Sequence, residues 1–90
     1  MAAIRRRVTA HGKVQGVFFR DSTREEAERR GVSGWVRNNP DGTVSAVFEG
    51  EPDIVEAMVW FVRDGPGSSD VGRVYVDEEE PAGLRGFKVT

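Results

Sequence analysis

Hydrophobic and polar residues alternate along the first segment of the chain, as they do in a β-strand with one buried face. Within residues 4–11, the apolar side is formed by Ile4, Val8 and Ala10, and the polar side by Arg5, Arg7 and Thr9. Arg6 falls on the apolar side. We therefore expect the start of this strand to be frayed or exposed at a sheet edge.

A short helix is predicted next, opening at Asp21 and Ser22. Ser22 is followed three residues later by Glu25, which fits a capping box, and Gly31 is a natural stop at the C-terminal end. The helix is only weakly apolar. The side chains available for its packing are Ala27 and the flanking Phe19 and Val32.

Two more alternating segments, residues 33–39 and 43–50, predict a β-hairpin. The connection between them, Pro40-Asp41-Gly42, has turn chemistry, because proline fixes φ and glycine takes the left-handed position. In the first of these strands one face is expected to carry Gly34, Val36 and Asn38.

A second helix is predicted to open at residues 51–53, where acidic residues meet the positive end of its dipole. Its core-facing stripe has the i, i+3, i+4, i+7, i+8 spacing and consists of Ile54, Ala57, Met58, Phe61 and Val62. A loop follows at residues 65–69, and Val74 and Val76 predict a fourth strand. We expect residues 78–81 to be a solvated acidic turn, and Phe87 and Val89 to form a short last strand.

This order, βαββαβ with a short terminal strand, predicts an α+β fold of the ferredoxin-like kind. Right-handed crossovers and a single helical layer give an antiparallel sheet with both helices on one face. Ninety residues suffice for one core, so we expect residues 1–90 to form a single domain. The fold hosts enzymes, RNA binders and metal carriers, and it does not decide the function.

The composition excludes several kinds of functional site. Without cysteine there are no disulfides, thiolate metal sites or cysteine nucleophile, and one histidine argues against a histidine metal cluster. No apolar run is long enough for a membrane span, and none follows the basic N-terminal residues as in a signal peptide. We expect a cytoplasmic monomer that needs no metal or cofactor and binds no membrane.

Charge bears on nucleic-acid binding. Thirteen basic and fifteen acidic residues give a net charge of −2, which argues against a dedicated nucleic-acid binder. The run Arg5-Arg6-Arg7 is compatible with a nucleic-acid patch. It lacks interleaved aromatic residues, which favours a solvated strand end. A phosphate site in this chain would be a local positive spot.

Residues 12–20, Gly-Lys-Val-Gln-Gly-Val-Phe-Phe-Arg, have the composition of a phosphate cradle. Two glycines four residues apart allow positive φ and leave backbone N–H groups free to point inward. The following helix start favours an anion, and Arg20 supplies a planar fork of donors. The segment is not a Walker loop. Taken alone, it is equally compatible with an ordinary strand-to-helix connection whose arginine faces solvent.

A second motif makes the pattern specific. Residues 34–44 read Gly-Trp-Val-Arg-Asn-Asn-Pro-Asp-Gly-Thr-Val, and together with the first loop they resemble the signature of the acylphosphatase family. That signature is a Gly-x-Val-Gln-Gly-Val-x-Phe/Tyr-Arg loop and a Gly-Trp-Val-x-Asn strand, then a glycine turn and a Val-x-x-x-x-x-Gly segment. The resemblance spans about the whole chain, although from Pro52 onward it lies in pattern more than in motif.

The resemblance implies roles for individual residues. Arg20 takes the place of the family's phosphate-binding arginine, and Asn38 takes that of its water-positioning asparagine. The cradle would be lined by the backbone amides of Gln15, Gly16, Val17, Phe18 and Phe19. Without the family pattern, Asn38 would be interpreted as a cap of the following turn. His11 is interpreted as structural and Lys13 as solvent-facing.

The implied function is the hydrolysis of small acyl phosphates to a carboxylate and inorganic phosphate. A carboxylate with a pKa of ~4 leaves at neutral pH without protonation, so the absence of a general acid from both motifs fits this chemistry. Two alternatives stay open. One is a non-catalytic anion-binding or regulatory module, as in the acylphosphatase-like domains of larger carbamoyl-transfer proteins. The other is an RNA-binding ferredoxin-like domain that would use Trp35.

Overall fold

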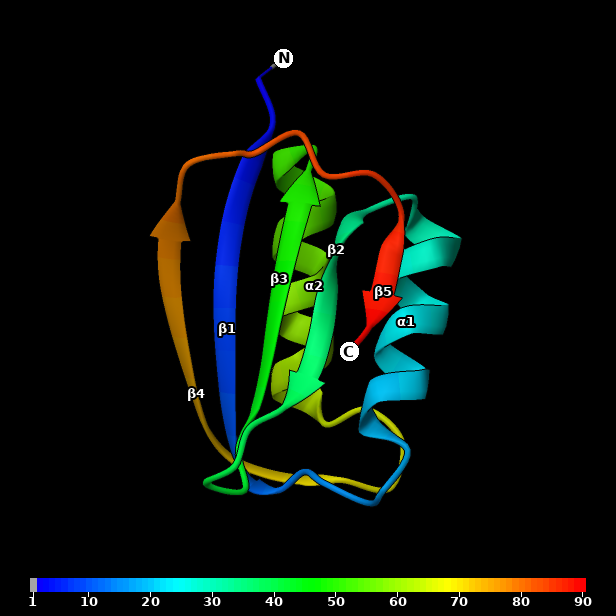
Figure 1. Cartoon of the computed structure of the whole chain (residues 1–90), viewed down its shortest axis with the longest axis vertical. Coiled ribbons are helices and arrows are strands. Elements are labelled where there is room, and N and C mark those ends of the chain that lie inside the picture. The colour runs from blue at the N-terminus through cyan, green and yellow to red at the C-terminus, as the bar shows by residue number, and fades with distance from the viewer. Residues whose placement is uncertain (1) are drawn as a thin grey trace.

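The computed structural model describes residues 2–90, and its elements follow the predicted order (Figure 1). They are β1 (Ile4–Lys13), α1 (Phe19–Arg30), β2 (Ser33–Asn38), β3 (Val44–Gly50), α2 (Pro52–Asp64), β4 (Asp70–Glu79) and β5 (Phe87–Val89). Among these residues, no helix has the length and apolar character needed to cross a membrane.

The five strands form one mixed sheet in the order β4-β1-β3-β2-β5. The first four pair antiparallel, as predicted. The expectation of a wholly antiparallel sheet is wrong at β5, which pairs parallel to β2. The connection from β4 crosses one end of the sheet to its opposite edge, so β5 enters from the end at which β2 begins (Figure 1).

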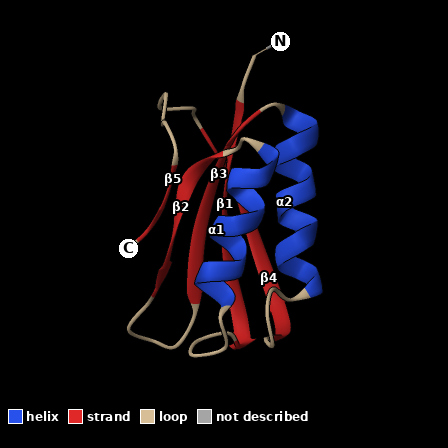
Figure 2. Ribbon diagram, turned by 90° about the vertical axis from the view of Figure 1, so that its right-hand side faces the viewer, coloured by secondary structure: helices blue, strands red, loops and turns tan. Residues whose placement is uncertain are grey.

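Both helices cover the same face of the sheet, as expected (Figure 2). The core between the two layers is built mainly from Val8, Ala10, Val36, Ala46, Phe48, Ala27, Val55, Met58 and Val62. The buried face of α2 is rotated slightly relative to the predicted one. Val55, which the prediction left out, is fully buried against the sheet. Ile54 and Phe61 lie at the margin of this face and are half-buried.

The start of α1 differs from the prediction. The helix begins at Phe19, and its N-cap residue Phe18 makes no capping bond through its side chain. Ser22 therefore lies inside the first turn, where its N–H donates to the carbonyl of Phe18 at 3.0 Å. The predicted capping box of Ser22 and Glu25 is wrong for this reason. The stop at Gly31 is confirmed, with a left-handed φ of 73°.

The three consecutive arginines lie in an ion-pair network. β1 is an interior strand, paired with β3 and β4 from its first residues, so the expected frayed or edge-exposed start is wrong. Arg5 and Arg7 both bind Glu79, at 2.8 and 2.7 Å, and Arg6 pairs with Glu78 at 3.1 Å. Both glutamates belong to β4. The predicted turn at residues 78–81 is wrong at these two positions, whereas the Glu78 side chain is solvated, as expected.

Trp35 lies on the sheet face away from the helices, beside the fully buried Val47 that pairs with it. The guanidinium carbons of Arg7 and Arg37 lie 5.2 and 5.0 Å from the centroid of its ring. The indole is half-buried. The aromatic ring that an RNA-binding reading would need is therefore already stacked by two cations of the protein.

Candidate active site

A cavity of about 260 Å³ opens between the β1–α1 loop and the ends of β2 and β5. It is lined by Val14, Gly16, Phe18, Phe19, Arg20, Asp21, Asn38 and Val89. The structure therefore brings together five of the residues expected at the site, from two motifs separated in the sequence. The predicted residues Gln15 and Val17 do not line this cavity.

The backbone of the β1–α1 loop, residues 14–18, has the form of an anion cradle. Gly16 and Phe18 both take positive φ values, 69° and 62°, and α1 begins immediately after Phe18. Among the described residues 2–90, the main-chain N–H groups of residues 15–21 donate to no recorded acceptor. Unpaired N–H groups at a helix N-terminus attract negative charge.

Arg20 lies in the first turn of α1 and lines the cavity beside these amides. Its guanidinium donates to the main-chain oxygen of Thr90 at 3.4 Å. No acidic side chain of residues 2–90 forms an ion pair with it. The guanidinium is thus anchored by one main-chain contact, and the remaining donors of the fork are free for an anion.

Asn38 ends β2 on the face shared with Gly34 and Val36, which puts its side chain at the cavity. Its Oδ1 atom is fully buried and has no hydrogen-bond partner among the described residues. The alternative role, capping of the β2–β3 turn, belongs to the neighbouring Asn39. Its Nδ2 donates to the hydroxyls of Thr43 and Ser45, at 2.9 and 2.8 Å.

Gln15 joins the two motifs through its side chain, which the sequence did not indicate. Its Nε2 donates to the carbonyls of Asn39 and Thr43, at 2.8 and 2.9 Å. The cradle loop is therefore bonded directly to the turn that follows Asn38. In that turn, the hydroxyl and N–H of Thr43 donate to Asp41, and these bonds lower the pKa of the Asp41 carboxyl.

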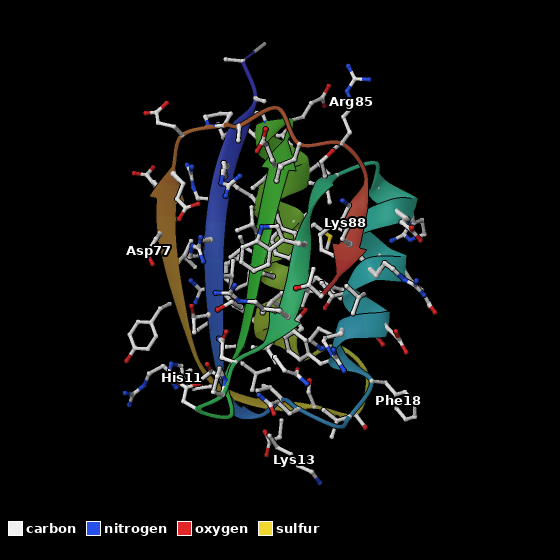
Figure 3. The ribbon with its side chains drawn as sticks, in the orientation of Figure 1. His11, Lys13, Phe18, Asp77, Arg85 and Lys88 are labelled. Atoms are coloured by element: carbon white, nitrogen blue, oxygen red, sulfur yellow. The ribbon has the colours of Figure 1, made fainter. Side chains whose placement is uncertain are left out.

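Three further side chains near the loop point elsewhere. Lys13 is exposed and projects into solvent, and Phe18 is 74% exposed and projects from the loop (Figure 3). The ring of His11 packs edge-on against Tyr75 with 5.3 Å between centroids, and His11 does not line the cavity. No cluster of His, Asp or Glu suited to a metal ion occurs within residues 2–90.

Three lining residues, Val14, Asp21 and Val89, were not among the site residues predicted from the sequence, although Val14 lies within the first motif. Asp21 is adjacent to Arg20 on α1, so the motif itself pointed near it. Val89 arrives through β5, whose parallel pairing with β2 places residues 87–89 opposite residues 34–36. Only the sheet topology reveals that position.

Comparisons with known proteins agree on one family. The sequence model described as Acylphosphatase matches residues 6–89. An acylphosphatase of Rubrobacter xylanophilus is 62% identical over 85 residues, which are 92% of this chain and 76% of that protein. An acylphosphatase of Thermococcus kodakarensis is 53% identical over 89 residues, which are 99% of this chain and 98% of that protein.

Solved structures give the same picture of the fold. The crystal structure of acylphosphatase from Bacillus subtilis superimposes with a TM-score of 0.91 at 33% identity, covering 97% of this chain and 98% of that chain. Full-length HypF, solved in a phosphate- and nucleotide-bound form, matches with a TM-score of 0.90 at 30% identity. That match covers 98% of this chain but 12% of HypF.

Proposed function

Because this chain belongs to the acylphosphatase family and has that enzyme's activity (EC 3.6.1.7), we propose that Arg20 and Asn38 carry the reaction. The substrate class is small acyl phosphates. The products are a carboxylate and inorganic phosphate. We further propose that residues 1–90 act as a single acylphosphatase-like domain and as a monomer, without a metal or other cofactor.

The leaving group explains why so few side chains are needed. Hydrolysis breaks the bond between phosphorus and the carboxyl oxygen, and the departing carboxylate has a pKa of ~4. It leaves at neutral pH without a proton, so no general acid is required. What the site must supply is positioning and charge stabilisation for an in-line phosphoryl transfer.

The phosphate is proposed to bind in the cradle. The N–H groups of residues 15–19 meet no acceptor among the described residues. Those of the lining residues Gly16, Phe18 and Phe19 would surround the non-bridging phosphate oxygens. The guanidinium of Arg20 would add a full positive charge on the same side. Donors that are fixed before the reaction stabilise developing charge without the cost of reorganising.

Asn38 is proposed to hold the attacking water. Its buried and unpaired Oδ1, in the same cavity as Arg20, is the observation that carries this assignment. A neutral amide has acceptor and donor atoms for a water molecule, and unlike a carboxylate it does not repel a dianionic substrate. The proton released by the water is proposed to pass to a phosphate oxygen.

The test is hydrolysis of benzoyl phosphate by the purified chain, with and without a metal chelator. We expect release of inorganic phosphate at the same rate in both. Measurable binding of phosphate without any hydrolysis of benzoyl or acetyl phosphate would instead favour a non-catalytic anion-binding module. The match to a small part of HypF makes that the second candidate.

A further inference from the structure

The loop between α2 and β4, residues 65–69, packs against the back of the cradle loop. The N–H of Ser68 donates to the carbonyl of Val17 at 3.2 Å, and the Ser68 hydroxyl donates to the same oxygen at 3.3 Å. Gly67 lies closer still. A Cβ atom at this position would come within 2.5 Å of the Val17 carbonyl oxygen and 3.2 Å of backbone atoms of Phe18.

These contacts set the orientation of one peptide group. No described peptide bond is cis, and in a planar trans peptide the C=O and the following N–H point in opposite directions. The Val17 carbonyl points at Ser68, so the Phe18 N–H points away from the 65–69 loop. None of residues 65–69 lines the cavity, whereas Gly16, Phe18 and Arg20 do. The Phe18 N–H is therefore aimed to the cavity side.

The peptide needs this support because the next residue is strained. Phe18, with φ of 62°, is the one non-glycine residue with positive φ among residues 2–90. The left-handed conformation costs free energy in any residue that has a Cβ atom. The exposed ring of Phe18 gains little packing that could offset this cost. The bond from the Ser22 N–H holds the Phe18 carbonyl, and the backbone contacts from Gly67 and Ser68 constrain the preceding peptide.

We propose that Gly67 and Ser68 are positioning residues of the phosphate cradle, which they hold in its anion-binding conformation through Val17. The proposal rests on the assignment of this loop as the phosphate site. Neither residue touches the substrate. They act by fixing the direction of the Phe18 N–H, and glycine is required at position 67 because any side chain would push the loops apart.

The experiment measures binding of inorganic phosphate by two-dimensional ¹H–¹⁵N NMR, following the Phe18 amide, together with benzoyl phosphate kinetics. Gly67→Ala is compared with Gly31→Ala, because Gly31 has a similar φ of 73° with open space around it. Gly31→Ala therefore introduces the same backbone strain as Gly67→Ala but no steric clash of the new Cβ atom. Ser68→Ala removes one donor to Val17, and Ser68→Thr restores it.

We expect Gly67→Ala to weaken phosphate binding about tenfold or more and to reduce the phosphate-induced shift of the Phe18 amide. Gly31→Ala should leave both near wild type. Ser68→Ala should weaken binding about threefold, the size of one ordinary hydrogen bond, and Ser68→Thr should recover it. If Gly67→Ala fails to fold, the two Ser68 variants decide.

Wild-type phosphate affinity and a full Phe18 shift in Gly67→Ala, or in Ser68→Ala where Gly67→Ala does not fold, would overturn the proposal. The catalytic assignment and the positioning role of Gly67 and Ser68 can be refuted independently of each other. A wild-type protein that binds phosphate but hydrolyses no acyl phosphate would refute the catalytic assignment, and the NMR comparison would still decide the role of Gly67 and Ser68.

Discussion

At the scale of single residues, the cavity holds one cation and one neutral amide whose surroundings leave them available. Arg20 pairs with no acidic side chain within residues 2–90, and the Oδ1 of Asn38 has no hydrogen-bond partner there. A buried polar atom without a partner costs free energy. A site that binds phosphate and water recovers that cost only when it is occupied.

Replacing Arg20 tests the charge in the cradle. Arg20→Ala should lose roughly 3 kcal/mol or more of transition-state stabilisation in kcat/KM while keeping the fold, because no core contact depends on the guanidinium. Arg20→Lys keeps the charge but loses the planar fork of donors, so its kcat/KM should lie between those of wild type and Arg20→Ala. Steady-state kinetics with benzoyl phosphate, alongside thermal unfolding, gives the answer; wild-type turnover by Arg20→Ala would contradict the assignment.

Asn38 and Asn39 form a natural pair for separating chemistry from turn structure. Asn38→Ala should lose roughly 3 kcal/mol, mainly in kcat, with phosphate affinity retained. Asn39→Ala breaks the two bonds to Thr43 and Ser45, so it should lower stability more than kcat. Kinetics and unfolding free energies are measured for both variants, and the reverse ranking in kcat would remove Asn38 from the mechanism.

The strain at Phe18 predicts a difference between two substitutions of the same exposed side chain. Asparagine tolerates the left-handed conformation better than alanine does. Phe18→Asn should therefore exceed Phe18→Ala in free energy of unfolding by about 0.5–1 kcal/mol. Urea denaturation measures it. Equal stabilities would mean that the left-handed backbone at this position carries little strain.

At the scale of elements, the connection between β4 and β5 is anchored by one buried carboxylate. Glu49 on β3 accepts hydrogen bonds from the N–H groups of Ala82, Gly83 and Leu84, at 2.6–3.2 Å, and pairs with Arg5 at 3.3 Å. Burial raises the pKa of Glu49, but these donors outweigh it, and the net pKa is below the ordinary value of 4.5.

This anchor predicts an acid-sensitive contribution to stability. A carboxyl whose pKa is lower in the folded state stabilises the fold above about pH 4.5, and the contribution is lost as the pH falls through the folded pKa. Glu49→Gln should cost about 2 kcal/mol at pH 7. The difference from wild type should shrink between pH 7 and pH 3, as the Glu49 carboxyl of the folded state begins to take up a proton and loses the charge that glutamine lacks.

The exposed Glu56 on α2 supplies the control, since it forms no ion pair within residues 2–90. Glu56→Gln should leave the unfolding free energy unchanged at both pH values, as measured by urea denaturation. A pH-independent loss in Glu49→Gln would show that Glu49 acts by packing and not by charge.

The elements themselves were largely predictable, because alternation and helical periodicity are local signals. The hairpin, both helices, the Gly31 stop and the helix-covered face all follow from them. The parallel pairing of β5, the interior position of β1 and the ion pairs of β1 depend on residues far apart in the sequence. Arg5 and Glu79, for example, are 74 positions apart. Likewise, the family pattern predicted Arg20 and Asn38 as site residues. The hydrogen bonds of the Gln15 side chain and the position of Val89 at the cavity could be seen only in the three-dimensional structure.

At the scale of the whole molecule, the site occupies one end of the sheet and the Glu49 anchor lies toward the other. The β1–α1 loop, the β2–β3 turn and the α2–β4 loop all meet at the site end (Figure 1). With a net charge of −2, the molecule as a whole does not attract anions. The phosphate affinity that we propose must therefore come from this end alone.

A ligand that binds only the folded state stabilises the whole molecule. Inorganic phosphate at 100 times its dissociation constant should raise the free energy of unfolding by about 2.7 kcal/mol. Arg20→Ala at the same phosphate concentration should gain much less. Thermal unfolding with phosphate, and with sodium chloride at matched ionic strength as a control, measures this; equal gains from both salts would indicate nonspecific screening.

The pairing of β1 with β4 has a kinetic consequence. Arg5 lies opposite Glu79, so the ladder between β1 and the edge strand β4 closes a loop of most of the polypeptide, and such closure is entropically slow. Gly67 and Ser68, the residues proposed to position the cradle, lie just before β4. We therefore expect the local β2–β3 hairpin to form before a competent anion pocket does, and catalytic competence to emerge only when the distant segments of the chain meet.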